Sequence, residues 1–184
     1  MHPVEQGLAA VVALLTARGA DGRTCWVGVD GLGASGKTTF TGRLAAALPG
    51  AVVVHVDGFA RPGAPTWDHQ LFSEQVLEPL LAGRPARWTE WDPYTGRPGQ
   101  DRTAEPGRPV LVEGVSATDR RVPVPWDVTV WVETPAEVRA ARARARDGEQ
   151  VWRERWLAEW IPSEQAYLRE QRPDLRADVV VAGG

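Results

Sequence analysis

One stretch near the start of the chain carries residues suited to holding phosphate. It reads VDGLGASGKTTF over residues 29–40 and fits G-x-x-x-x-G-K-[ST] at every fixed position, from Gly31 to Thr38. Glycines allow backbone angles that turn successive N–H groups toward one point, where they bind phosphate oxygens with the positive end of the following helix. The lysine of this pattern reaches the β- and γ-phosphates, and the next hydroxyl ligates Mg²⁺. The pattern therefore predicts a phosphate-binding loop, or P-loop.

The predicted loop gives a first set of binding residues. We expect it to hold ATP or GTP together with Mg²⁺. The residues expected to bind the nucleotide are Gly31, Gly33, Ala34, Ser35, Gly36, Lys37, Thr38 and Thr39. A chance glycine turn with a surface lysine is the alternative. The match falls between a predicted strand and a predicted helix, where the mechanism needs it, and this favours the P-loop.

Two acidic residues follow other apolar runs. Asp57 comes after VVVHV and Glu113 after VLV. Because ligands in open α/β sheets bind outside the carboxyl ends of the strands, both acids should face the γ-phosphate and the metal. One would accept a proton from an attacking hydroxyl, and the other, with Thr38, would hold the metal or its water. A turn or helix cap is the alternative for each. We expect Asp30, directly before the loop, to be structural and His55 to pack in the core.

One predicted helix is rich in arginine. It carries Arg139, Arg142, Arg144 and Arg146. The first, second and fourth of these share a helix face by their spacing. Arginines near a transferring phosphoryl group neutralise the charge on its oxygens, whereas a solvated basic face is the ordinary alternative. With the loop present, we expect Lys37, Asp57 and these three arginines to be the catalytic residues.

Short apolar runs bounded by turn residues predict the strands. We expect them over residues 25–30, 51–57, 109–114, 127–133 and 177–183. Strands that alternate with helices predict an α/β fold with a mainly parallel sheet of about five strands and helices on both faces. Together with the loop, this is the P-loop NTPase fold, with a short lid.

Helical periodicity and stop signals place the helices between these strands. We expect helices from Val4 to the turn at 19–22, and over 37–48, 68–83, 134–148 and 149–171, with a short hairpin within 84–108. Asp68 and Thr134 are predicted N-caps. Pro162 predicts a kink or break in the last of these helices.

Composition excludes several classes of protein. The net charge of −3 is unlike the basic surface of a dedicated nucleic-acid binder. No apolar run approaches the roughly 18 residues of a membrane span. One cysteine, Cys25, allows no internal disulfide and fits a reducing compartment. We therefore expect a cytoplasmic protein with no nucleic-acid or membrane partner, and the sequence leaves a homo-oligomer open.

The chain resembles the uridine kinase family of P-loop kinases, close to its phosphoribulokinase and pantothenate kinase branch. The matching stretches are GVDGLGASGKTT, VVHVDGF, WDHQLFSEQVLEPLLAGRP, EWDPYTG, PVLVEGV, VWVETPAEVRAARARARD and ADVVVAG. The resemblance covers nearly the whole chain, from Trp26 to Gly183. The resemblance implies one kinase domain over 1–184, with an acceptor-binding region at about 58–108 and a lid at about 139–155.

The resemblance also implies roles for single residues. Asp57 matches the family aspartate that activates the acceptor hydroxyl, and Glu113 matches the glutamate of its Glu-Gly pair. Arg139, Arg142 and Arg146 match its lid arginines. The resemblance implies that the acceptor is bound by the base and by residues in or beside the family's Phe-Asp and Tyr-Asp-Phe segments. These residues are Asp57, Trp67, Asp68, Trp91, Asp92 and Tyr94.

The departures from the family fall in the acceptor half. Gly58 stands where the family has a second Asp or Ser, and a family tyrosine is replaced near Ala60 and Arg61. The base-reading histidine of some members falls at about Gly96. The aromatic residues of this region could stack on a pyrimidine, but donors for its edge are not evident. The phosphotransfer half is thus well matched and the nucleoside-reading half is not.

The tryptophans divide into two groups. Trp152, Trp156 and Trp160 are spaced by four, which is more typical of helix packing than of a ligand site. Trp88 and Trp91 lie in a proline-rich stretch where burial is harder, and we expect them nearer a pocket.

These observations predict a kinase that transfers the γ-phosphoryl group of ATP or GTP to a hydroxyl of a small molecule. A pyrimidine nucleoside, uridine or cytidine, is the family default. A different hydroxyl metabolite, such as a sugar, a pantothenate-like acid or a specialised metabolite, is the alternative that Gly58 and the missing histidine favour. A nucleotide-binding regulatory module without an acceptor is the rival from another class. A GTPase switch is weaker, because no Asn-Lys-x-Asp segment is present.

Overall fold

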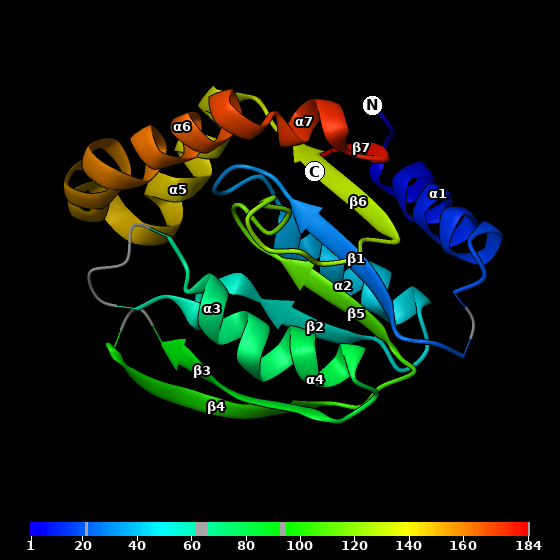
Figure 1. Cartoon of the computed structure of the whole chain (residues 1–184). Coiled ribbons are helices and arrows are strands. Elements are labelled where there is room, and N and C mark those ends of the chain that lie inside the picture. The colour runs from blue at the N-terminus through cyan, green and yellow to red at the C-terminus, as the bar shows by residue number, and fades with distance from the viewer. Residues whose placement is uncertain (21, 62–65, 93–94, 184) are drawn as a thin grey trace.

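A five-stranded sheet with all neighbouring strands parallel forms the centre of the computed structural model, which describes residues 1–20, 22–61, 66–92 and 95–183. The spatial order of the strands is β2-β5-β1-β6-β7 (Figure 1). They are β1 (Cys25–Asp30), β2 (Val52–His55), β5 (Pro109–Glu113), β6 (Val128–Glu133) and β7 (Val179–Ala182). The predicted α/β fold with a parallel sheet is confirmed.

Strand β1 is buried along its whole length because both faces of the sheet are covered. On one face, Val27 and Val29 pack with Phe40 and Leu44. Those two side chains come from α2 (Lys37–Ala47), and α1 (Val4–Ala17) covers the same side. On the other face, Trp26 belongs to a second core with side chains of residues 72–80. Helices therefore lie on both faces, as predicted.

The helix predicted over 68–83 forms in three pieces. They are α3 (His69–Phe72), a π-helical turn η2 (Ser73–Leu77) and α4 (Glu78–Leu81). Asp68 is the predicted N-cap, and its carboxylate accepts from the Leu71 N–H at 2.9 Å. Pro79 has no N–H to donate one turn back, so the regular α-helical ladder cannot run through the segment.

A hairpin of β3 (Ala86–Asp92) and β4 (Arg97–Ala104) lies apart from the central sheet, along α3 and α4 (Figure 1). It confirms the hairpin predicted within 84–108. Ala86 and Trp88 face inward and join the core, while Arg87 between them is exposed. Trp88 was expected near a pocket because of the surrounding prolines. Trp88 does line a hollow, together with His55 and Arg102, but the premise about burial is wrong, because the alternation of the strand buries the ring among core side chains.

The C-terminal helices gather beyond the carboxyl ends of the sheet strands (Figure 1). They are α5 (Ala136–Val151), a π-helical stretch η3 (Trp152–Trp160), α6 (Ile161–Gln171) and α7 (Pro173–Arg176). Gly148, with φ 83° and ψ 167°, interrupts α5. Pro162 was predicted to kink or break the helix. The chain does not break there, since Trp160 keeps helical angles (φ −72°, ψ −50°), but it changes from the π-helical η3 to α6 one residue before this proline, which has no N–H to donate one turn back. Trp152 and Trp156 are buried together, which confirms the packing interpretation of the stripe.

Two predicted details at the ends of elements are wrong. The second strand ends at His55, and a 3₁₀ turn, η1 (Val56–Phe59), carries Asp57 instead. Thr134 does not cap α5. Its hydroxyl donates to the Ser35 carbonyl at 2.9 Å and so ties the end of β6 to the P-loop. Within the described residues, no helix is both long enough and apolar enough to cross a membrane.

Candidate active site

The P-loop joins β1 to α2 and has the backbone that phosphate binding requires. Gly31, Ala34 and Gly36 have φ of 153°, 59° and 94°, so the chain alternates in direction and its N–H groups converge. A Cβ on Gly31 would lie 2.7 Å from the Val132 carbonyl oxygen, which explains the glycine there. Lys37 is only 7% exposed, and its Nζ donates to the Leu32 carbonyl at 3.0 Å. The lysine thus lies along the loop.

Several buried donors have no partner among the residues that the structure describes. Nη1 of Arg142, on α5, is one of them, and the Ser35 hydroxyl, within the loop itself, is another. Buried polar groups are nearly always hydrogen-bonded, so such groups call for an explanation. A phosphate group would supply acceptor oxygens at this place. The loop and its surroundings therefore fit a nucleotide phosphate.

The metal-binding residues expected from the sequence lie together. Thr38 Oγ1 donates to Glu113 Oε1 at 3.2 Å. Because Mg²⁺ is usually held by one or two carboxylates, waters and substrate phosphates, this pair fits a magnesium site beside the loop. In the described part of the chain, no three or more His, Cys, Asp and Glu side chains are grouped to hold a metal by themselves.

His55 is a member of this site that the sequence analysis placed wrongly. It was expected in the core because it alternates within a strand. Its side chain is instead 39% exposed, and Nδ1 lies 2.5 Å from Glu113 Oε1. The hydrogen bond to Glu113 raises the pKa of His55, against an opposing effect of burial. The pairing with Glu113, 58 positions away, could be found only from the parallel register of β2 and β5.

Asp57 lies one turn beyond β2, beside the metal-binding residues. Its side chain reaches solvent, but the surrounding protein is close enough to desolvate the carboxyl and raise its pKa. Lys37, His55 and Arg146 oppose that rise, whereas Glu113 adds to it. Asp57 therefore stands within the electrostatic reach of both the loop lysine and a lid arginine, and it could accept a proton from a hydroxyl placed there.

The three lid arginines take different positions. Arg139 lies against the loop, with Nη1 donating to the Gly33 carbonyl at 3.4 Å and Nε to the Thr134 carbonyl at 3.2 Å. Arg146 donates to Asp147 at 2.8 Å and 3.0 Å. Arg142 has the unpartnered Nη1 described above. Their assignment as catalytic residues stays a prediction.

Several of the residues predicted to bind the acceptor already contact other side chains or backbone groups of the protein. Trp67 is buried, with its ring against His69 and Phe72 and its Nε1 donating to Ser116 Oγ at 3.1 Å. The Asp68 carboxylate caps α3, and the Asp92 carboxylate accepts from the Thr95 N–H at 3.2 Å. The Trp91 ring lies 5.4 Å from the Arg61 guanidinium. Tyr94, with Pro93, falls outside the described residues. Their roles toward an acceptor remain predictions.

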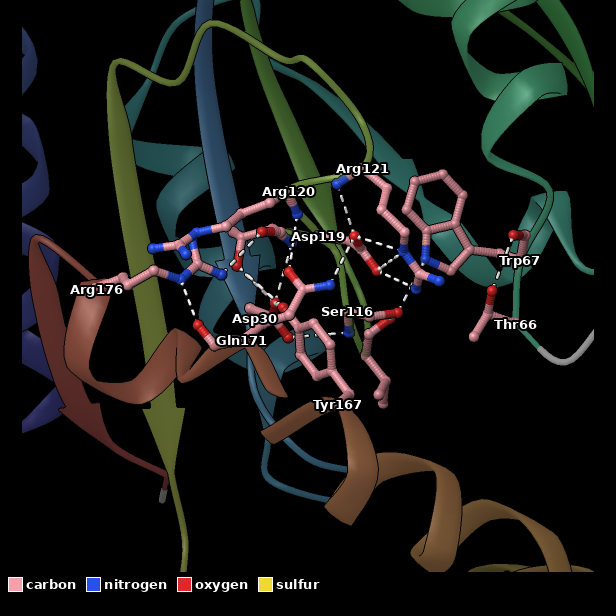
Figure 2. Close-up of polar contacts among 12 residues, drawn as sticks. Asp30, Thr66, Trp67, Ser116, Asp119, Arg120, Arg121, Tyr167, Gln171 and Arg176 are labelled. Atoms are coloured by element: carbon pink, nitrogen blue, oxygen red, sulfur yellow. Dashed lines mark hydrogen bonds and ion pairs between the residues drawn. The ribbon is translucent and has the colours of Figure 1, made fainter. Parts of the chain in front are cut away.

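Asp30 is the structural residue expected from its position before the loop. Its carboxylate accepts hydrogen bonds from the N–H groups of Gly31, Ser116 and Thr118 and from the hydroxyls of Thr118 and Tyr167, at 2.6–3.0 Å. Figure 2 shows Asp30 with Ser116 and Tyr167. Burial, together with the Asp30 charge, raises the pKa of Tyr167, so this hydroxyl stays a donor. Asp30 thereby joins the P-loop, the segment after β5 and α6.

A second buried carboxylate extends this network, as Figure 2 shows. Asp119 accepts from the Arg121 guanidinium at 2.5–3.1 Å and from Gln171 Nε2 at 2.9 Å. Burial alone would raise the pKa of Asp119, but these hydrogen bonds outweigh it and lower the pKa to about 2. The carboxylate therefore stabilises the fold in its ionised form.

Acid should weaken the fold in part through Asp119. The folded pKa lies below the ordinary value of 3.8, so the stabilisation is present above pH 4 and is lost as the pH falls toward 2. Between pH 5 and pH 3, the free energy of unfolding should fall by about 1 kcal/mol more in the unmodified protein than in Asp119→Asn. Urea unfolding at both pH values, with Glu105→Gln as an exposed control, measures this. If the free energy of unfolding fell equally in Asp119→Asn and in the unmodified protein, the lowered pKa of Asp119 in the folded state would be contradicted.

Comparison with solved structures supports the fold. No protein-family model and no curated protein sequence matches the chain. A solved structure from Bacillus stearothermophilus, described as a possible uridine kinase, superposes with a TM-score of 0.71 at 21% identity, covering 96% of this chain and 98% of that one. A candidate fructose transport system kinase from Silicibacter sp. TM1040 gives 0.64 at 21% identity, covering 98% and 99%. The chain therefore has the fold of P-loop kinases.

Proposed function

We propose that this protein is a kinase that transfers the γ-phosphoryl group of ATP or GTP to a hydroxyl of a small molecule. One observation carries the proposal. The P-loop lysine, the Thr38–Glu113 pair and the Asp57 carboxylate meet beyond the carboxyl ends of three neighbouring strands, β1, β5 and β2. A phosphate-binding loop, oxygen ligands for a metal and a base are the groups that phosphoryl transfer to a hydroxyl requires.

Each of these groups has a role in the proposed reaction. The loop N–H groups and Lys37 bind the phosphates, and Asp57 accepts the proton of the attacking hydroxyl. Arg139, with Arg142 and Arg146 on the same helix, neutralises charge on the transferred group. When bound, Mg²⁺ would neutralise charge on the phosphate oxygens, and Thr38 and Glu113 would hold it, with Asp57 adjacent. The lid helices exclude water from the site.

The acceptor is first proposed to be a pyrimidine nucleoside, on the resemblance to the uridine kinase family and the likeness to a possible uridine kinase. A sugar or another hydroxyl metabolite is the second proposal. It is favoured by the region around Gly58, where a Cβ would lie 3.1 Å from Glu90 Cγ. Glu90 thus occupies space that a larger residue at position 58 would need. Its Oε1 is buried and lacks a partner among the described residues, so it could accept from an acceptor hydroxyl.

A panel of acceptors tests the proposal. We expect ADP release, measured by a coupled assay, to rise well above background with at least one of uridine, cytidine, ribose, fructose and pantothenate. Stimulation by uridine or cytidine supports the first acceptor, and stimulation by ribose or fructose alone supports the second. Lys37→Ala should abolish the signal. Nucleotide binding without any stimulated release would favour the regulatory-module alternative.

A further inference from the structure

A carboxylate from α6, the helix that follows the lid, already lies on the P-loop. Glu164, in the first turns of α6, accepts a hydrogen bond from the Gly33 N–H at 3.0 Å. It is 6% exposed, and its other carboxylate oxygen lies 3.7 Å from Arg139 Nη1. The same arginine donates to the Gly33 carbonyl, so both backbone groups of Gly33 are hydrogen-bonded, the N–H to Glu164 and the carbonyl to Arg139. Glu164 therefore uses a loop donor that would otherwise face a phosphate.

The packing around Gly33 shows that the lid is closed on the loop. A Cβ on Gly33 would lie 2.6 Å from Glu164 Oε1 and 2.6 Å from Trp156 Cη2. Ala34, the next loop residue, packs against the lid cluster that contains Trp152 and Trp156. The lid is therefore in direct contact with the third and fourth positions of the loop, and little room is left above Gly33.

Glu164 interacts with charged residues that are also proposed to take part in phosphoryl transfer. Burial raises the pKa of Glu164, while the Gly33 N–H, Lys37 and Arg139 lower it and Asp57 raises it. The carboxylate therefore interacts with both the loop lysine and the proposed base. Since the lysine of this motif reaches the β- and γ-phosphates, an anion that interacts with Lys37 has a charged neighbour in common with a bound γ-phosphate. The Glu164 carboxylate balances positive charge on Lys37 and Arg139. A bound γ-phosphate would otherwise balance that charge.

We propose that Glu164 is an internal substitute for the γ-phosphate, which holds α6 on the loop and must be displaced when a nucleoside triphosphate binds. A diphosphate, which lacks the γ group, binds without displacing it. Glu164 then lowers the affinity for the triphosphate alone. It thereby sets the ratio of the affinities for the triphosphate and the diphosphate. This inference rests on the nucleotide-binding half of the proposed function and needs no acceptor.

Equilibrium titrations of ATP and ADP, followed by tryptophan fluorescence or calorimetry, test the role of Glu164. In Glu164→Gln the affinity for ATP should rise by about tenfold, because the protein no longer spends most of its time closed on the internal anion. The affinity for ADP should change by less than about threefold. The glutamine keeps an oxygen for the Gly33 N–H, so the loop should remain formed. Glu170→Gln, on the exposed side of the same helix, controls for the loss of one negative charge.

A measurement on the unmodified protein makes the test independent of any substitution. In hydrogen exchange, the non-hydrolysable ATP analogue AMPPNP should increase exchange in α6 around Glu164, and ADP should not. Weaker ATP binding by Glu164→Gln, or equal gains for ATP and ADP, would overturn the inference and leave Glu164 as a support of the loop. No binding of either nucleotide by either protein would overturn the proposed function as well.

Discussion

Replacing Asp57 by asparagine should abolish phosphoryl transfer and leave nucleotide binding nearly intact. Asparagine keeps the size and the polarity of the side chain but cannot accept a proton from the attacking hydroxyl. General-base catalysis contributes about 10²–10⁴ to a rate, so turnover should fall by at least about 100-fold. The nucleotide is held mainly by the loop and Lys37, so its dissociation constant should stay within about threefold. Stimulated ADP release and nucleotide titration measure the two quantities on the same preparation.

A matched control separates the base from a general effect of charge. Glu5 lies exposed on α1, outside the loop, the acceptor-binding region and the lid, and Glu5→Gln should keep normal turnover. Near-normal turnover in Asp57→Asn would show that another group takes the proton. Loss of nucleotide binding together with turnover would place Asp57 in the nucleotide and metal site instead. Asp57 was expected at a strand end, and it lies on the 3₁₀ turn just beyond one, where it can still face Lys37.

The Asp30→Ala substitution should have the largest effect on stability. It removes an acceptor that five donors share in a buried place, and unsatisfied buried donors cost about 1–3 kcal/mol each. Since the cavity allows some relaxation and water entry, we expect a loss of about 4 kcal/mol in the free energy of unfolding. For a chain of this size, the melting temperature should fall by roughly 8–16 °C.

Tyr167→Phe is the matched variant for Asp30→Ala. It removes one donor of the network and keeps the ring, so it should cost only about 1 kcal/mol. Urea unfolding followed by circular dichroism gives both values. If Asp30→Ala lowered the free energy of unfolding by less than Tyr167→Phe, the Asp30 carboxylate would not be the organising group of this network. Thr118→Val offers a further comparison, because it removes one hydroxyl donor and leaves the backbone N–H in place.

Local patterns in the sequence were sufficient for the phosphate half of the site. The loop could be recognised because its residues are contiguous and each has its role through backbone conformation. Strands β1, β5 and β6 could be placed to within one residue, since a buried parallel strand is a short apolar run with turn residues at its ends. Once the strands are parallel, their carboxyl ends share one edge, and Glu113 and Asp57 follow from that.

Residues that depend on the packing of distant segments could not be predicted in the same way. Glu164 is 131 positions from Gly33, and Tyr167 is 137 positions from Asp30. Neither has a sequence pattern of its own, since both lie in a polar helix whose inward face is set by how α6 docks. His55 was misplaced for a related reason, because its partner Glu113 comes from a neighbouring strand.

The sequence by itself determined the class of fold, the phosphate-binding loop and the edge of the sheet where chemistry can occur, because these follow from contiguous residues and from the alternation of strands and helices. Only the tertiary structure decided which side chains meet at that edge. Strand register brought His55 to Glu113, and the docking of α6 brought Glu164 to the loop. Hydrogen bonds and ion pairs act over a few ångströms, and which distant residues come that close is set by how the whole chain packs.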